Sequence, residues 1–140
     1  MLPESIESHP IAATWAPDVA DRYRAFARLV AGGNKLETTI GRGGLSFYAH
    51  RSGSRIFVCH FNAAPRSGRD DLGFADFKPA ALARRADADA VAADLQRRLG
   101  PDIALRRGKA WYGAHFARER DADVAAAFRD AVVAAVFGQR

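Results

Sequence analysis

The sequence predicts an α+β fold in which helices pack on one face of an antiparallel sheet of five to six strands, in the order α-βββ(β)-α-ββ-α. Three observations support this prediction. Amphipathic helical patterns lie near both ends of the chain, apolar residues alternate with a period of two between residues 36 and 61, and glycine-rich links separate the alternating segments. Strands joined by short links pair antiparallel, and helices segregated from such strands cover one face of the sheet.

The first predicted element is a helix that begins at Asp18 and ends at Gly32-Gly33. Its apolar residues recur at helical spacing and are Val19, Tyr23, Phe26 and Val30. Residues 1–17 contain three prolines and show little periodicity. We therefore expect an N-terminal arm over 1–17 and a single α+β domain over 18–140, because a chain of this length buries a sizeable core without needing disulfides or metal ions for stability.

Three consecutive antiparallel strands are predicted next, over residues 35–40, 45–50 and 55–61, with the glycine-rich link GRGG reversing the chain between the first two. In those two strands the apolar face consists of Leu36, Thr38, Ile40, Leu45, Phe47 and Ala49. The third strand is apolar on both faces, so we expect it in the centre of the sheet. Strict alternation would place Phe57, Cys59 and Phe61 on one face of that strand, with Val58 and His60 on the other.

The second half of the chain adds two helical regions and three shorter strands. Residues 72–77 form a predicted short strand, and a helical region over 79–99 ends at Gly100-Pro101. Residues 103–108 and 110–116 then form a pair of strands that turns at Gly108. A wide apolar stripe over 121–137 predicts a closing helix that lies against the sheet.

The charge of the chain favours an anionic partner. Its formal net charge of +5 and its pI of about 10.0 promote association with polyanions, such as nucleic acid, through long-range attraction and counterion release. GC-rich coding is an alternative source of the same charge, because the basic residues are nearly all arginine and alanine is abundant.

The lone cysteine and the N-terminus bear on the compartment. Cys59 cannot form an internal disulfide and lies in an apolar run, where a buried thiol is the usual occupant. The N-terminus lacks the pattern of a signal peptide, and no run of 18 apolar residues occurs. We expect a cytoplasmic protein with no membrane-spanning segment.

The most informative stretch is GKAWYGAHF, residues 108–116, which alternates basic, aromatic and small side chains. Its mixed face consists of Lys109, Trp111, Gly113 and His115, and its more apolar face of Ala110, Tyr112, Ala114 and Phe116. An indole ring can stack on a base while neighbouring cations neutralise phosphates. The candidate nucleic-acid-binding residues are Arg106, Arg107, Lys109 and Trp111, with the loop arginines Arg66 and Arg69. The alternative is that Trp111 packs under a loop or the N-terminal arm.

Two further interpretations remain open. A small ligand or a protein partner can bind in a pocket on the sheet face, which Tyr48, His50, Trp111 and His115 would line. A metal-dependent hydrolase is the weaker alternative; its ligands would be the strand histidines His50, His60 and His115, or the acids Asp70, Asp71 and Asp76 beside Lys78. The spacing lacks the paired ligands of zinc motifs, so we predict no catalytic residue, no metal ligand and no cofactor.

Four segments of the second half of the chain share a pattern with known proteins: RSGSRIFVCHF, ADAVAADLQRRLG, RRGKAWYGAHF and the closing helix opened by DADV. On these segments, which together span roughly residues 44–137, the chain resembles the YjbR/MmcQ-like family of small bacterial proteins. The resemblance implies an α+β fold with suggested DNA binding and no established enzymatic activity, and it points to Lys109 and Trp111. The long segment over 62–85 departs from the family pattern. We therefore expect a non-enzymatic cytoplasmic module that binds nucleic acid with low specificity.

Overall fold

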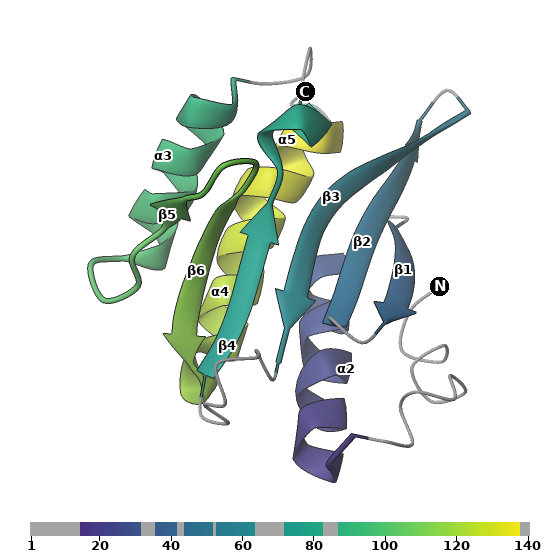
Figure 1. The fold of residues 1–140 in the computed structure, drawn as a ribbon, viewed down its shortest axis with the longest axis vertical. Helices are drawn as coiled ribbons and strands as arrows, with labels where there is room; N and C mark the ends of the chain where they lie inside the picture. The colour runs from purple at the N-terminus through teal and green to yellow at the C-terminus, as the bar shows by residue number, and fades with distance from the viewer. Residues whose placement is uncertain are drawn as a thin grey trace.

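The computed structural model describes residues 15–31, 36–41, 44–51, 53–63, 72–82 and 87–137 (Figure 1). Its strands are β1 (Leu36–Gly41), β2 (Gly44–Arg51), β3 (Ser54–Asn62), β4 (Leu72–Phe77), β5 (Arg106–Arg107) and β6 (Tyr112–Ala117). Its helices are α2 (Pro17–Ala31), α3 (Ala88–Leu99), α4 (Asp121–Phe128) and α5 (Ala134–Phe137), with the short 3₁₀ helices η2 (Pro79–Leu82) and η3 (Arg118–Arg120) and the π-helical segment η4 (Arg129–Val133) between α4 and α5. The predicted α+β class and order of elements are confirmed; most of the predicted arm lies outside the described residues.

The strands form one six-stranded sheet in the order β1-β2-β3-β4-β6-β5, and every neighbouring pair is antiparallel. The predicted reversal at the GRGG link is confirmed, because Gly41 and Gly44 face each other at the end of the β1–β2 pair. Gly44 has a φ of +123°, and a Cβ there would lie 2.2 Å from the carbonyl oxygen of Phe61. Only glycine fits this position, where β2 passes close to β3. Strand β3 is central, as its apolar composition predicts.

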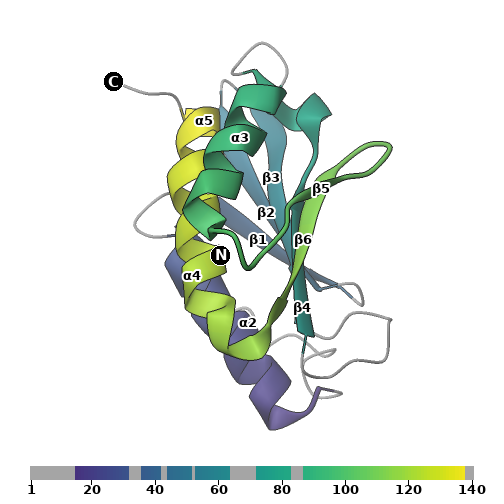
Figure 2. The same cartoon turned by 90° about the vertical axis from the view of Figure 1, so that its left-hand side faces the viewer.

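The helices that the structure describes lie on one side of the sheet (Figure 2). Helix α2 begins at Pro17 rather than at Asp18, and the amide of Ala20 donates to the carbonyl of Ala16, 3.1 Å away. Proline suits this first position because its fixed φ is helical and the position needs no amide donor. Asp18 lies inside the first turn, where its carboxylate accepts from Arg118. Within the described residues, no helix is long and apolar enough to cross a membrane.

Helix α3 positions the short edge strand β5. The helix begins after Asp87, whose side chain accepts from the amide of Asp89 at 3.0 Å. At its other end, the Gln96 amide nitrogen donates to the carbonyls of Gly100 and Ile103, and its oxygen accepts from the amide of Leu105. One glutamine side chain therefore fixes the path of the chain from the end of α3 to the start of β5.

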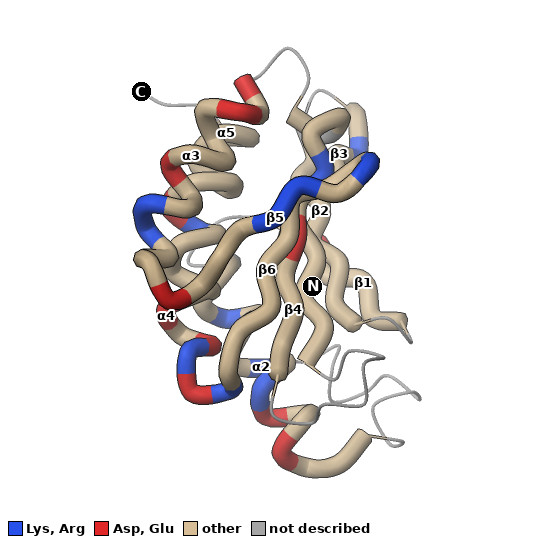
Figure 3. Tube along the Cα trace, turned by 60° about the vertical axis from the view of Figure 1, so that its left-hand side comes forward, with Lys and Arg blue, Asp and Glu red and all other residues tan. Residues whose placement is uncertain are grey.

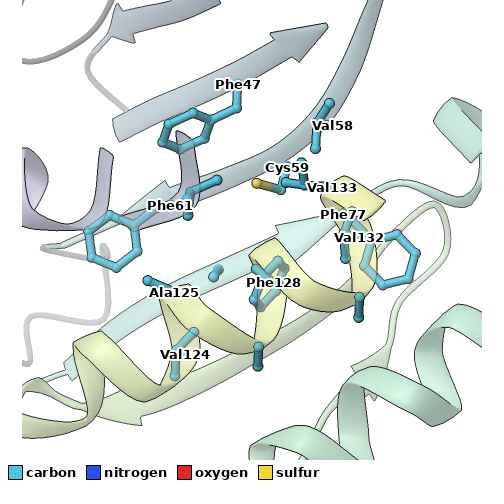
Figure 4. Close-up of a cluster of buried hydrophobic side chains, with 14 of the residues drawn as sticks. Phe47, Val58, Cys59, Phe61, Phe77, Val124, Ala125, Phe128, Val132 and Val133 are labelled. Atoms are coloured by element: carbon cyan, nitrogen blue, oxygen red, sulfur yellow. The ribbon is translucent and has the colours of Figure 1, made fainter. Parts of the chain in front are cut away.

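The core lies between the sheet and the closing helical run α4–η4–α5, as the apolar stripe predicts. Figure 4 shows side chains of β2, β3 and β4 facing this run. The largest side chains with no exposed surface are Phe26, Phe47, Phe61, Phe77 and Phe128. Phe61 stacks on Phe26 of α2 with ring centroids 3.8 Å apart, and it also contacts Tyr23 and Phe116. This aromatic contact joins α2 to the centre of the sheet.

A bulge in β3 corrects the predicted alternation of that strand. Phe57 pairs with Tyr48, whereas Cys59 pairs with Phe47, so Val58 is one extra residue on the β3 side. Val58 and Cys59 are both fully buried, and Phe57 and His60 are only partly buried. The prediction that Phe57 shares a face with Cys59 and Phe61 is therefore wrong. Beyond the bulge every side chain changes face, which brings His60 to the same side as Phe57.

Candidate functional site

The face of the sheet that points away from the helices is the candidate site, and we call it the open face. The described helices lie on the opposite side of the sheet (Figure 2). The open face carries Tyr48, His50, Arg55, Phe57, His60, Phe74, Asp76, Lys78, Trp111 and His115, all of them partly or fully exposed. Its rings come from four different strands. Within β6 the predicted separation of faces is confirmed, since Tyr112, Ala114 and Phe116 are buried and His115 is exposed. Ala110, predicted on the buried face, is exposed because the strand begins only at Tyr112.

Trp111 is half-buried and packs against Phe74 of the neighbouring strand. The two ring centroids are 5.6 Å apart and the ring planes are nearly perpendicular, at 86°. The Phe74 ring also contacts His115, with centroids 4.7 Å apart. The indole is therefore held by an edge-to-face contact on the open face and keeps part of its surface in solvent.

Two glycines make room for the indole. A Cβ on Gly113 would lie 2.6 Å from the Phe74 ring and 2.9 Å from the Trp111 ring, and a Cβ on Gly108 would lie 2.4 Å from the indole. All three distances are shorter than a real Cβ contact allows. The turn is closed by the amide of Gly108, which donates to the carbonyl of Trp111 at 2.7 Å. The spacing G-x-x-W-x-G thus lets the ring lie directly against the hairpin backbone.

Basic residues gather along β5 and the turn that follows it (Figure 3). Arg106 lies opposite Gly113 on the open face, Lys109 lies in the turn, and both are exposed. Lys78 follows β4 on the same face, with its ammonium 5.3 Å from the centroid of the Phe57 ring. These three cations border the aromatic residues.

Two other groups of predicted cations are placed differently. Arg107 lies opposite Tyr112, on the side of the helices, where its guanidinium donates to the Tyr112 hydroxyl at 2.7 Å and to Asp89 of α3 at 3.1 Å. It links β5 to α3 and is turned away from the open face. The predicted loop residues Arg66 and Arg69 lie outside the described residues.

Most arginines of the helical layer are neutralised by carboxylates. Their ion pairs are Arg22–Asp121, Arg24–Asp21, Arg97–Asp94, Arg98–Asp94, Arg118–Asp18, Arg120–Asp123 and Arg129–Asp130. Among the basic side chains that the structure describes, Arg28, Lys78, Arg106 and Lys109 take part in no ion pair. Three of these four unpaired cations border the open face. The surplus positive charge of the described residues is therefore concentrated there, although the arginines themselves are spread over the molecule.

The four residues of the alternative ligand pocket do not converge. Tyr48 and His50 belong to β2, whereas Trp111 and His115 belong to or adjoin β6, and β3 and β4 lie between them. Strands β2 and β6 are three strand spacings apart, so the two pairs of residues are separated by about 14 Å. Tyr48 and His50 also have partners of their own. The Arg55 guanidinium lies 3.7 Å above the Tyr48 ring, and His50 Nε2 lies 2.8 Å from Glu37.

The residues considered for a metal are also dispersed. His50, His60 and His115 occupy three different strands, and Asp70 and Asp71 lie outside the described residues. No group of three or more His, Cys, Asp or Glu side chains suited to a metal occurs among the described residues. Cys59 is fully buried, and burial raises the pKa of its thiol.

A pair of titratable side chains at the centre of the open face is absent from the sequence-based prediction. His60 and Asp76 lie directly opposite each other on β3 and β4, with His60 Nδ1 3.8 Å from Asp76 Oδ2. The Asp76 side chain is 15% exposed, and its Oδ1 is buried without a hydrogen-bond partner. Burial raises the pKa of Asp76 to about 6, although the nearby Lys78 ammonium acts to lower it. The open face therefore holds a carboxylate with unused acceptor capacity.

Replacing Asp76 with asparagine is expected to stabilise the protein at neutral pH. The pKa of this carboxyl rises from 3.8, its ordinary value, to about 6 in the folded state, so folding favours the protonated form. The stability of the wild type should increase as the pH falls from about 6 to about 4, and asparagine lacks this dependence. Urea denaturation should show Asp76→Asn more stable by as much as about 3 kcal/mol near pH 8, with the difference vanishing near pH 4. A stability difference between Asp76→Asn and the wild type that does not change with pH would contradict the raised pKa of Asp76.

Comparison with known proteins identifies no relative, since no family model, no curated protein and no solved structure matches the chain. The resemblance to the YjbR/MmcQ-like family stays a prediction.

Proposed function

We propose that the open face of the sheet binds single-stranded nucleic acid, with cations supplying most of the affinity and aromatic rings stacking on bases. The observation that carries the proposal is the half-buried Trp111–Phe74 pair bordered by Lys78, Arg106 and Lys109, which form no ion pair among the described residues. Aromatic side chains beside a positively charged surface are the usual elements of sequence-tolerant single-strand binding.

The form of the surface favours single strands over duplexes. Unpaired bases can stack on rings of a sheet, whereas the bases of a duplex are already stacked within it. To read the bases of a duplex, a protein must insert a helix or a β-ribbon into one of its grooves. The described helices lie on the other side of the sheet, and their arginines are largely occupied by carboxylates. The proposed ligand therefore contacts β4, β6 and the turn before β6.

Fluorescence anisotropy with a labelled oligothymidine tests the proposal. Binding should weaken as salt increases, and three phosphate contacts would give a slope of log K against log salt of about −2. Lys109→Ala should make the slope less steep by about 0.7, because one counterion fewer is released. Trp111→Ala should weaken binding by about 5- to 150-fold, which corresponds to the loss of one stacked base.

Arg28→Ala is the matched control for Lys109→Ala. Arg28 is an exposed cation on α2 that takes part in no ion pair among the described residues, and it belongs to the helical layer. Its removal changes the net charge by the same amount and should leave the salt slope as in the wild type. Equal slopes for the two variants would show that binding is due to overall charge, and no binding at about 50 mM salt would reject the proposal.

A further inference from the structure

The partly buried carboxylate of Asp76 has no role in the contacts described above. It lies in the middle of the open face, between His60 on β3 and Gly113 on β6, with Phe74 and Lys78 two residues away on its own strand. The rings of Phe74 and Trp111 fill the space above Gly113, so they lie beside this carboxylate. A flat ligand that stacks on these rings would place its edge near Asp76.

The unused hydrogen-bond capacity of Asp76 restricts the chemistry of that edge. Its Oδ1 is buried without a donor, and the 3.8 Å from His60 to Oδ2 is too long for a hydrogen bond. A buried acceptor that lacks a donor is costly, and an N–H group from a ligand would remove this cost. Rotation about the Cβ–Cγ bond is soft for aspartate, so either oxygen can turn towards the ligand. The matching ligand edge therefore presents N–H donors.

Charge and geometry together select one base. Lys78 and Arg106 on the same face disfavour a cationic ligand, so the donors must belong to a neutral ring. Guanine presents two adjacent donors, N1–H and N2–H, to a carboxylate. Adenine and cytosine each place an acceptor nitrogen beside their amino group, and thymine and uracil flank their single N–H with carbonyl oxygens. Those acceptors would face a carboxylate unfavourably.

We propose that Asp76 selects guanine on the open face, by accepting hydrogen bonds from N1–H and N2–H of an unpaired guanine that stacks beside Phe74 and Trp111. This inference rests on the proposed single-strand binding and adds a preference at one base position. It requires an unpaired base, because both donor groups are occupied in a Watson–Crick pair.

The test compares an oligothymidine with the same strand carrying one central guanosine, by anisotropy at pH 8, where Asp76 is ionised. The guanosine strand should bind about 5- to 150-fold more tightly, the discrimination expected of a bidentate contact. Inosine, which lacks the N2 amino group, should give an intermediate affinity. Asp76→Asn should bind the two strands with similar affinity, since its amide group presents a donor to one of the two guanine donors.

Glu37→Gln is the matched control, because Glu37 is another carboxylate on this side of the sheet whose oxygens already accept from Arg55 and His50. It should keep the preference of the wild type. A wild type that binds both strands equally, or an Asp76→Asn variant that retains the preference, would overturn the inference and leave the proposed function standing. Absence of binding to either strand would overturn both.

Discussion

Replacing Phe61 with alanine should lower the free energy of unfolding by about 3–5 kcal/mol. The ring has no exposed surface and contacts Phe26, Tyr23 and Phe116, so its removal leaves a cavity where α2 meets the sheet. Interiors are closely packed, and the surrounding rings can fill such a cavity only in part. Urea denaturation followed by far-UV circular dichroism measures the effect.

Phe57→Ala provides the control within the same strand. Phe57 is half-buried on the open face, where its ring contacts Tyr48 and lies below the Lys78 ammonium. Because the variant opens a surface depression and leaves the core intact, it should cost about 1 kcal/mol. Similar costs for the two phenylalanine substitutions would mean that the bulge in β3 does not divide the strand as described.

Replacing Arg22 with alanine should cost about 3–5 kcal/mol, because it leaves a partly buried carboxylate without its partner. The Arg22 side chain is 9% exposed, and its Nε and Nη2 donate to the two oxygens of Asp121 at 2.6 and 3.0 Å. Its Nη1 also donates to the carbonyl of Ala63 at 2.8 Å. This guanidinium thereby joins α2 to the start of α4 and to the end of β3. Urea denaturation at neutral pH measures the loss.

Two comparisons test the origin of that loss. Arg97→Ala removes an exposed arginine that pairs with Asp94 within α3, and it should change stability by no more than about 0.5 kcal/mol. The double variant Arg22→Ala/Asp121→Ala should be less destabilised than the sum of the two single variants, because it removes the uncompensated charge. Additive effects would show that the two side chains do not stabilise each other.

The fold is predictable from the sequence wherever one face of an element is buried and the other is not. Strands β1 and β2 alternate strictly between core and open-face residues, as at Phe47 and Tyr48, so their pattern identifies both the strands and their faces. The apolar stripe over residues 121–137 identifies the closing helix and its buried face equally well. The start of α2 differs by one residue, because Pro17 and Asp18 are both common at helix N-termini.

The site is only partly predictable. The face of Trp111 follows from alternation within β6, but its contact with Phe74 depends on the pairing of β4 with β6, which are separated in sequence by α3. The His60–Asp76 pair depends on the register between β3 and β4 and on the bulge at Val58. No local sequence pattern predicts the pairing of β4 with β6, the register between β3 and β4 or the bulge. Arg107 is a different case, because alternation along a strand is local and already places two adjacent arginines on opposite sides of the sheet.

The bulge in β3 makes Val58 a residue that this strand can lose without exchanging the faces of its neighbours. Without Val58, Phe57 and His60 would stay on the open face and Cys59 and Phe61 in the core, in regular alternation. One residue added after Cys59 would instead turn His60 into the core and Phe61 out of it, so β3 should tolerate a shortening at the bulge far better than a lengthening beyond it.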